Sequence, residues 1–186
     1  MKNEEFVDRL ELLKHQSNLL IMNYKIFLTT VLFIVVSLTQ LIPAQLNAQD
    51  VEWTSIEHAQ ELSSEDNKPL FVFVEAEWCG TCKQMLANVF PEEKVKRTLN
   101  ENYHPVSIDL DSEQKIIFNG EEMTEREFAR SQKISATPTM LFIDNNGEEL
   151  GRQLGFMDAD EITKLMIYVI SDQFNEISFE EFKSGG

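Results

Sequence analysis

Two cysteines, the only ones in the chain, stand at positions 79 and 82, directly after Trp78. A cysteine thiolate can attack a disulfide bond, and a second thiol nearby can then resolve the mixed disulfide that forms. A purely structural bridge between Cys79 and Cys82 would close a very short loop and stabilise the fold by only about 2 kcal/mol. A tetrahedral zinc site needs about four ligands, and the three histidines of the chain show no ligand spacing. The pair therefore favours redox chemistry over a structural or metal-binding role.

A strand and a helix must position these cysteines. Residues 70–74 form a short apolar block rich in β-formers, which predicts a buried strand. Residues 83–88 are mostly good helix formers. Cys79 is thus expected near the first turn of a helix, where unpaired N–H groups and the helix dipole stabilise a thiolate and lower its pKa. Cys82 lies one helical turn further in, so we predict Cys79 as the nucleophile and Cys82 as the resolving thiol.

Two motifs carry a resemblance to a known family. The sequence Trp-Cys-Gly-Thr-Cys at 78–82 resembles the motif that opens the first core helix in the thioredoxin superfamily, and Ala-Thr-Pro-Thr at 136–139 resembles the cis-proline loop that faces its cysteines. Within the superfamily the chain is similar to periplasmic members. Residues 155–159 resemble the C-terminal thioredoxin-like domain of the transmembrane disulfide reductase DsbD, and residues 120–138 resemble the SoxW-like group. The resemblance covers about residues 51–172.

The resemblance implies three loops that hold a substrate near Cys79, at Trp78, at Thr137 with Pro138, and at Gly155. A cis bond before Pro138 costs only about 0.5–1 kcal/mol and leaves the backbone of Thr137 free to pair with an extended peptide. Gly155 permits close approach of another backbone. The ordinary alternatives are a trans proline at a strand entry and a glycine in a helix-entry turn. No cofactor or metal is expected.

The chain departs from the thioredoxin pattern at two places. Thioredoxins carry a buried aspartate six residues before the first cysteine, where this chain has Phe73. Glu75, two residues later, lies on the same face of the strand. Either Glu75 takes over the proton transfer to and from Cys82, or it is a strand-end carboxylate in water. The dipeptide Gly-Thr at 80–81 replaces thioredoxin's Gly-Pro, so the redox potential cannot be transferred from the family.

The whole chain fits one α/β domain. Its 186 residues carry 16 Lys and Arg against 32 Asp and Glu, for a net charge of -16. This balance argues against nucleic acid as a partner, because a phosphate backbone rewards clustered basic residues. Strands are predicted near 106–110, 139–143 and 148–154, with capping boxes at Thr54 and Thr124 opening helices. The expected architecture is a thioredoxin fold, a mixed four- to five-stranded sheet with helices on both faces.

Four segments are expected along the chain. Residues 1–21 form a leader that can be an over-called start, since Met22 begins a second plausible N-terminus. Residues 22–48 are a signal peptide or a membrane anchor, with an apolar centre at 26–42. The thioredoxin-like domain spans 49–173, and 174–186 is an acidic tail. Both readings of 22–48 place the domain outside the cytoplasm, in the periplasm or anchored and facing it, with membrane contact only through 26–42 if this segment is not cleaved.

These observations predict an extracytoplasmic thiol–disulfide oxidoreductase that reduces protein disulfides or relays electrons from a membrane donor or another redox partner. Glu75 and Glu77 precede Cys79, and Lys83 is the only cation close in sequence. This charge pattern depresses the Cys79 pKa only moderately, as a reductant requires. The alternatives are a disulfide oxidase or isomerase of the same fold, a redox-inert binding or chaperone module, and a peroxidase, which typically lacks this cysteine motif.

Overall fold

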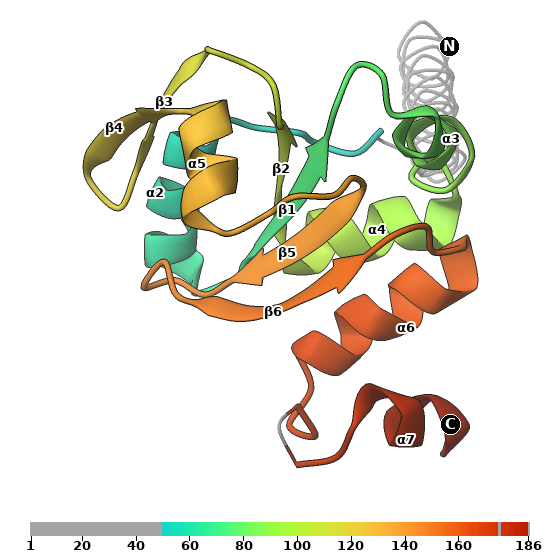
Figure 1. Cartoon of the computed structure of the whole chain (residues 1–186). Coiled ribbons are helices and arrows are strands. Elements are labelled where there is room, and N and C mark those ends of the chain that lie inside the picture. The colour runs from blue at the N-terminus through green and yellow to red at the C-terminus, as the bar shows by residue number, and fades with distance from the viewer. Residues whose placement is uncertain (1–49, 175, 186) are drawn as a thin grey trace, which may run out of the picture. The chain divides into compact units, whose positions relative to one another are not determined.

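The computed structural model describes residues 50–174 and 176–185, and a four-stranded mixed sheet lies at its centre (Figure 1). The strand order is β2-β1-β5-β6. β1 (Leu70–Glu75) pairs in parallel with β2 (His104–Asp109) and antiparallel with β5 (Thr139–Ile143). β5 pairs antiparallel with β6 (Glu149–Leu154). The predicted mixed sheet of four to five strands is therefore confirmed, with four strands.

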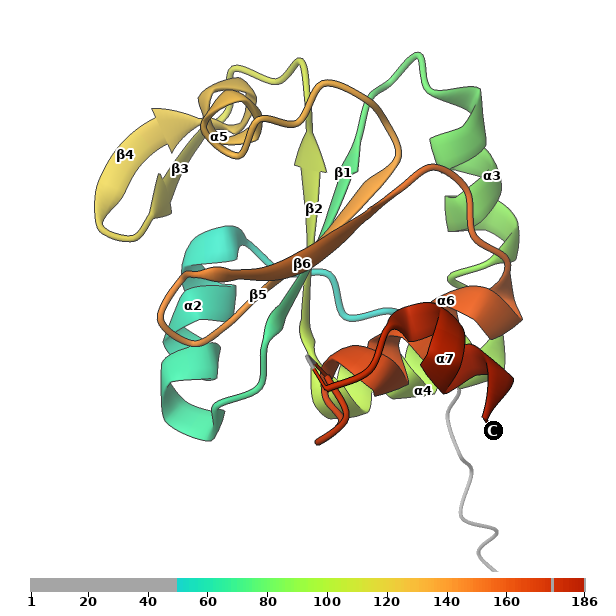
Figure 2. The same ribbon diagram turned by 60° about the horizontal axis from the view of Figure 1, so that its bottom comes forward.

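Helices cover both faces of this sheet, as expected (Figures 1 and 2). One face is covered by α2 (Ile56–Asp66) and α5 (Glu125–Ser131). The other is covered by α3 (Gly80–Asn88), α4 (Glu93–Asn102) and α6 (Ala159–Val169). The crossover from β1 to β2 runs through α3 and α4, because two parallel neighbours need a long connection.

β1 is the shared centre of two hydrophobic cores. Phe71 and Phe73 point into the core beneath α3, α4 and α6, whereas Leu70, Val72 and Val74 point into the core beneath α2 and α5. All five side chains are fully buried. Successive strand residues point to opposite faces, so a strand covered on both faces has no polar position until its end. The predicted buried strand is confirmed, and the chain emerges from it at the cysteine turn.

A hairpin that the sequence analysis did not predict lies between β2 and α5. β3 (Lys115–Phe118) and β4 (Glu121–Thr124) form a separate two-stranded sheet. The turn at its tip contains Asn119 and Gly120, at φ of 52° and 80°. The Glu57 carboxylate of α2 accepts the N–H of Ile117 at 2.6 Å, so the hairpin is fastened to the domain.

Two capping boxes were predicted, and one of them is correct. Thr124 caps α5 and Glu127 reaches back to the backbone N–H of Thr124, as predicted. The box at Thr54 is wrong, because Ser55 is the N-cap of α2 and its hydroxyl accepts the N–H of His58. Thr54 instead forms an isolated parallel bridge to Val106 in β2. The helix therefore starts one residue later than predicted.

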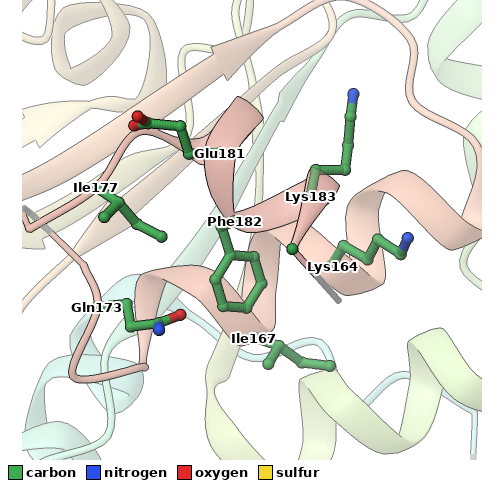
Figure 3. A pocket seen from close by; sticks show the side chains of 8 residues that line it. Lys164, Ile167, Gln173, Ile177, Glu181, Phe182 and Lys183 are labelled. Carbon is green, nitrogen blue, oxygen red and sulfur yellow. The ribbon is translucent and has the colours of Figure 1, made fainter.

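The segment expected to be an acidic tail contains a helix, α7 (Phe179–Ser184), which packs on α6. The ring of Tyr168 contacts the rings of Phe174, Phe179 and Phe182, with centroid distances of 5.2–5.6 Å. Between α6 and α7 lies an open pocket of about 330 Å³ with Ile167 in its lining, toward which Phe182 points (Figure 3). Aromatic residues spaced along an acidic sequence therefore hold this segment against the domain.

The predictions for 1–21 and 22–48 lie outside the described residues. Within residues 50–174 and 176–185, no helix combines the length and the apolar character that crossing a membrane requires.

Candidate active site

Cys79 and Cys82 lie where β1 gives way to α3. Cys79 is the N-cap of α3, and its own N–H donates to the carbonyl of Ala76 at 2.9 Å. The two cysteines form a disulfide with their Cα atoms 5.3 Å apart. Residual exposure distinguishes them, since Cys79 keeps 4% of its surface and Cys82 none. A reaction partner can therefore reach the pair only from the Cys79 side.

The start of α3 provides a hydrogen-bond donor to sulfur. The backbone N–H of Cys82 donates to the Sγ atom of Cys79 at 3.1 Å. The first N–H groups of a helix have no partner within the helix, and the dipole favours negative charge there. After reduction, the same N–H can stabilise a thiolate at Cys79. The expected placement of Cys79 at a helix N-terminus is thus present in the structure.

Trp78 stands beside the disulfide as an exposed aromatic surface. Its side chain is 68% exposed. The indole N–H donates to Asp111, the residue two positions after β2, at 2.7 Å. The sequence analysis selected Trp78 and missed Asp111. The available signal was topological, because the carboxyl ends of parallel neighbours such as β1 and β2 meet at the same edge of a sheet.

The other two predicted substrate loops are joined to each other. The Thr137–Pro138 peptide bond is cis, and the carbonyl of Pro138 accepts the N–H of Gly155 at 2.9 Å. Gly155 has φ of 85°, a conformation that a side chain would strain. The hydroxyl of Thr137 is buried and has no hydrogen-bond partner among the described residues. Thr137, Pro138 and Gly155 therefore form one unit, held by the end of the β5–β6 hairpin.

Met157 connects this unit with the cysteines. It is 5% exposed and belongs to the same hydrophobic cluster as Cys79 and Cys82. The sequence analysis named the segment around Met157 only through a family resemblance and assigned this residue no role. A methionine is adaptable in packing and contacts sulfur and aromatic groups readily. The loop before α6 thus contributes to the apolar environment that buries the disulfide.

Glu75 ends β1 in a partly buried acidic environment. Burial raises the pKa of Glu75, and Asp109 and Glu125 raise it further, while Lys83 opposes them. Asp109 is its register partner on β2. The elevated pKa suits a group that exchanges protons, although the structure gives Glu75 no hydrogen bond to either cysteine.

The position of the missing thioredoxin aspartate is completely apolar. Phe73 is fully buried, and its ring contacts those of Phe90 and Trp53 at 4.9 Å and 6.2 Å between centroids. A carboxyl group at position 73 would be desolvated beside the rings of Trp53 and Phe90, which costs several kcal/mol unless it stays neutral. Any protein carboxylate that serves Cys82 must therefore come from elsewhere, and Glu75 is the acid nearest in the strand.

A model of the thioredoxin-like domain family matches residues 56–170. The chain belongs to this family. The disulfide bond reductase DsbH of Chlamydia pneumoniae is 28% identical over 112 residues, which cover 59% of this chain and 65% of DsbH. The thiol:disulfide interchange protein DsbD of Yersinia pestis is 31% identical over 100 residues, which cover 53% of this chain and 15% of DsbD.

Solved structures agree with the family assignment. The structure of a thioredoxin from Thermus thermophilus superposes with a TM-score of 0.52 at 26% identity, over 63% of this chain and 85% of the thioredoxin. The matched region spans less than two thirds of the length of DsbH and a small part of DsbD. The family model ends at residue 170, so α7 lies beyond the matched domain.

Proposed function

We propose that this protein reduces disulfide bonds in extended protein segments outside the cytoplasm. The observation that carries the proposal is the asymmetry of the cysteine pair. Cys79 lies at the start of α3, slightly exposed and hydrogen-bonded through sulfur, whereas Cys82 is sealed in the core. This arrangement gives one thiol the role of meeting a substrate and leaves the other to act only after Cys79 has reacted.

The reaction begins from the dithiol form. The Cys79 thiolate attacks one sulfur of the substrate disulfide, forms a mixed disulfide, and releases the other substrate sulfur as a thiolate that takes up a proton. The Cys82 thiol loses its proton and attacks the Cys79 sulfur. The Cys79–Cys82 disulfide forms, and the second substrate sulfur leaves as a thiol after protonation. Two electrons pass from the protein to the substrate, and a dithiol redox partner must restore the reduced form.

An extended substrate segment fits the surroundings of Cys79. Trp78 offers an exposed apolar surface on one side. On another, Thr137 lies at the end of the β5–β6 hairpin, and Gly155, which donates its N–H to Pro138, has no side chain to obstruct a second backbone. Main-chain hydrogen bonds to such a segment provide affinity that does not depend on sequence. We assign substrate binding to Trp78, Thr137 and Gly155, and catalytic roles to the cysteines, Pro138 and Glu75.

Charge and the name of one relative support the proposed direction of the reaction. Glu75 and Glu77 precede Cys79 in the sequence. Lys83 on α3 is the cation whose charge lowers the pKa of Glu75. A negative environment opposes a strongly stabilised thiolate and so favours a reductant. The name of DsbH as a disulfide bond reductase points the same way. We further propose a membrane electron donor, as an exported reductase requires.

Trapping experiments test the proposed order of the two thiols. Cys82→Ser should accumulate mixed disulfides with a protein substrate such as insulin, whose two chains are joined by disulfides, because the resolving thiol is gone. Cys79→Ser should accumulate none, because Cys82 is inaccessible. Non-reducing gels followed by mass spectrometry identify the linked cysteine. Trapping through Cys82 would reverse the assignment, and absence of any exchange in the unmodified protein would leave a binding module as the function.

The redox potential tests the direction. Equilibration of the Cys79–Cys82 pair with glutathione should give a potential closer to that of thioredoxin, about -270 mV, than to that of DsbA, about -120 mV. In intact cells, alkylation of free thiols should find the pair mostly reduced. A mostly oxidised pair, together with substrates that gain disulfides, would identify an oxidase instead.

A further inference from the structure

We propose that Arg126 of α5 is a positioning residue for thiol–disulfide exchange, because it holds the loop that fixes Trp78 beside Cys79. The proposal rests on the function proposed above and adds to it a residue remote from the cysteines in sequence. The sequence analysis assigned Arg126 no role. The structure gives Arg126 contacts that an ordinary surface arginine lacks.

Trp78 depends on one polar contact for its orientation. Its side chain is 68% exposed, so packing does not hold the ring. Among the described residues, the indole N–H makes one hydrogen bond, which it donates to the Asp111 carboxylate at 2.7 Å. Asp111 is itself an exposed loop residue. The orientation of Trp78 is therefore only as fixed as the loop that carries Asp111.

Arg126 bonds to three consecutive residues of that loop. Its guanidinium donates to the backbone carbonyl of Asp111 at 2.6 Å and forms an ion pair with Glu113. Its backbone N–H donates to the carbonyl of Ser112 at 3.1 Å. The planar guanidinium presents several donors in a fixed arrangement, so one side chain can serve two acceptors at once. A lysine at the same place would offer a single point charge.

The helix that carries Arg126 is anchored in the domain. The Glu125 carboxylate accepts the N–H of Asp109 at 3.2 Å, and the Glu125 N–H donates to the carbonyl of Gln114 at 3.0 Å. Phe128 is fully buried, and Thr124 caps the helix. Contacts thus run without interruption from the core through α5 and the loop to the indole of Trp78.

Fixing Trp78 matters for a large substrate and little for a small one. A protein segment that docks on Trp78 binds better when the ring is already oriented, since ordering it during binding costs free energy. A small aromatic disulfide that reaches only the sulfur atom gains little from the ring. Loss of Arg126 should therefore raise KM for a protein substrate, leave kcat nearly unchanged, and leave the reduction of a small disulfide unaffected.

The first measurement follows Trp78 directly and needs no activity. The chain has two tryptophans, so Trp53→Phe leaves Trp78 as the reporter. Time-resolved fluorescence anisotropy of Arg126→Ala in this background should show about a twofold larger amplitude of fast ring motion. Arg126→Lys should give an intermediate value. Arg130→Ala, on the exposed last turn of the same helix, is the matched control and should resemble the unmodified background.

Two variants of Asp111 separate positioning from general damage to α5. Asp111→Ala removes the acceptor of the indole N–H without touching Arg126, and should reproduce the larger ring motion. Asp111→Asn keeps a side-chain oxygen and should restore most of the order. Far-ultraviolet circular dichroism verifies that each variant is folded. If Arg126→Ala is unfolded, the comparison between Arg126→Lys and Arg130→Ala decides.

The second measurement is kinetic. For insulin reduction, Arg126→Ala should raise KM by about fivefold, the effect of losing one positioning hydrogen bond. Reduction of the small aromatic disulfide 5,5′-dithiobis(2-nitrobenzoate) should proceed at the unmodified rate. Folded Arg126 variants with unchanged ring motion and unchanged KM would overturn the proposal, as would equal losses on both substrates. A failure of the unmodified protein to reduce any disulfide would refute the proposed function alone, because the anisotropy result stands without it.

Discussion

At the scale of single residues, the site differs from thioredoxin in the position of the acidic side chain on the strand that leads to the cysteines. Phe73 and its aromatic neighbours exclude a carboxyl group from the usual buried position. Glu75 lies two residues later, partly buried and next to Asp109, and burial is the main cause of its raised pKa. The acid nearest to this position in the strand thus lies at the end of β1, where water also reaches it.

Glu75→Gln should slow the second step of exchange and stabilise the fold. Glu75 can accept the Cys82 proton only when ionised, so the unmodified protein should resolve mixed disulfides faster as pH rises through the raised pKa, and the variant should lack this rise. The ionised form is disfavoured in the folded state. That cost is absent below the usual value of 4.5 and fully present above the raised pKa.

Stopped-flow measurement of mixed-disulfide resolution between pH 4 and 8 tests the first effect. Urea denaturation near pH 7 tests the second, with an expected gain below about 1 kcal/mol, since solvent screens a partly exposed group. Glu77→Gln, at an exposed neighbouring position, is the matched control. Equal pH profiles for Glu75→Gln and the unmodified protein would leave Glu75 as a surface carboxylate.

Asp66 and His104 should make stability depend on pH at the other end of the sheet. Partial burial disfavours the Asp66 carboxylate, but hydrogen bonds from His104 at 2.9 Å and from Lys68 lower its pKa from 3.8 to about 2. A depressed pKa contributes stability that is present above the unfolded value and lost as pH falls through the folded value. Asp66→Asn should cost about 1 kcal/mol near pH 7 after allowance for screening.

Urea denaturation at several pH values checks this expectation. The difference between Asp66→Asn and the unmodified protein should vanish as pH falls from about 4 to about 2, the interval between the unfolded and folded pKa values. Glu61→Gln, which alters an exposed pair with His58, should show a much smaller effect. A difference that persists at pH 2 would show that the carboxylate charge is not its source.

At the scale of elements, the caps show how local signals compete. Thr54 and Ser55 are both good N-cap residues, and the Thr-x-x-Glu spacing favoured Thr54. The structure uses Ser55, because Thr54 donates its backbone N–H to Pro105 at 2.9 Å and bridges to β2. A tertiary contact therefore moved the helix start by one residue.

Substitution at the two positions should separate them. Ser55→Ala should lower the free energy of unfolding by about 1 kcal/mol, because the N–H of His58 loses its acceptor. Thr54→Ala, the matched control, should cost less, since its contact with Pro105 is through the backbone. Guanidinium denaturation followed by circular dichroism measures both. A larger loss at Thr54 would show that the hydroxyl of Ser55 contributes little to α2.

The competition between local sequence signals and tertiary contacts explains how much of the fold and the site was predictable. The buried strand β1, the cysteine turn, and the cap at Thr124 follow from composition and spacing within a few residues, and these predictions are correct. The β3–β4 hairpin was missed, because two four-residue strands give too little alternation to be distinguished from a loop. Asp111 and Arg126 were missed because their contacts join segments that only the fold brings together.

At the scale of the whole molecule, α7 is a helix that the acidic composition of its segment did not indicate. Its segment is acidic, and the sequence analysis therefore predicted a tail. Within it, Phe179 and Phe182 are three apart on one helical face, and Ser178 with Glu181 forms a capping box. These signals are those of an amphipathic helix. Since α7 lies beyond the matched family domain, it can be altered with little expected consequence for exchange chemistry.

Removing the main aromatic contact of α7 should therefore affect stability and leave activity intact. Phe182 packs on Tyr168 with centroids 5.2 Å apart and is half-buried, so Phe182→Ala should cost about 2 kcal/mol, less than the 3–5 kcal/mol of a fully buried phenylalanine. The loss reaches the core because Tyr168 also donates its hydroxyl to the carbonyl of Ile177 and is 8% exposed on the inner face of α6. Ile170→Ala, at the exposed C-cap of α6, should cost much less. Urea denaturation measures the loss, and insulin reduction well below the unfolding transition should be unchanged.

Two outcomes would contradict this expectation. A large fall in activity without a fall in stability would mean that α7 takes part in exchange. An unchanged stability would mean that the acidic segment is held by contacts other than its aromatic rings.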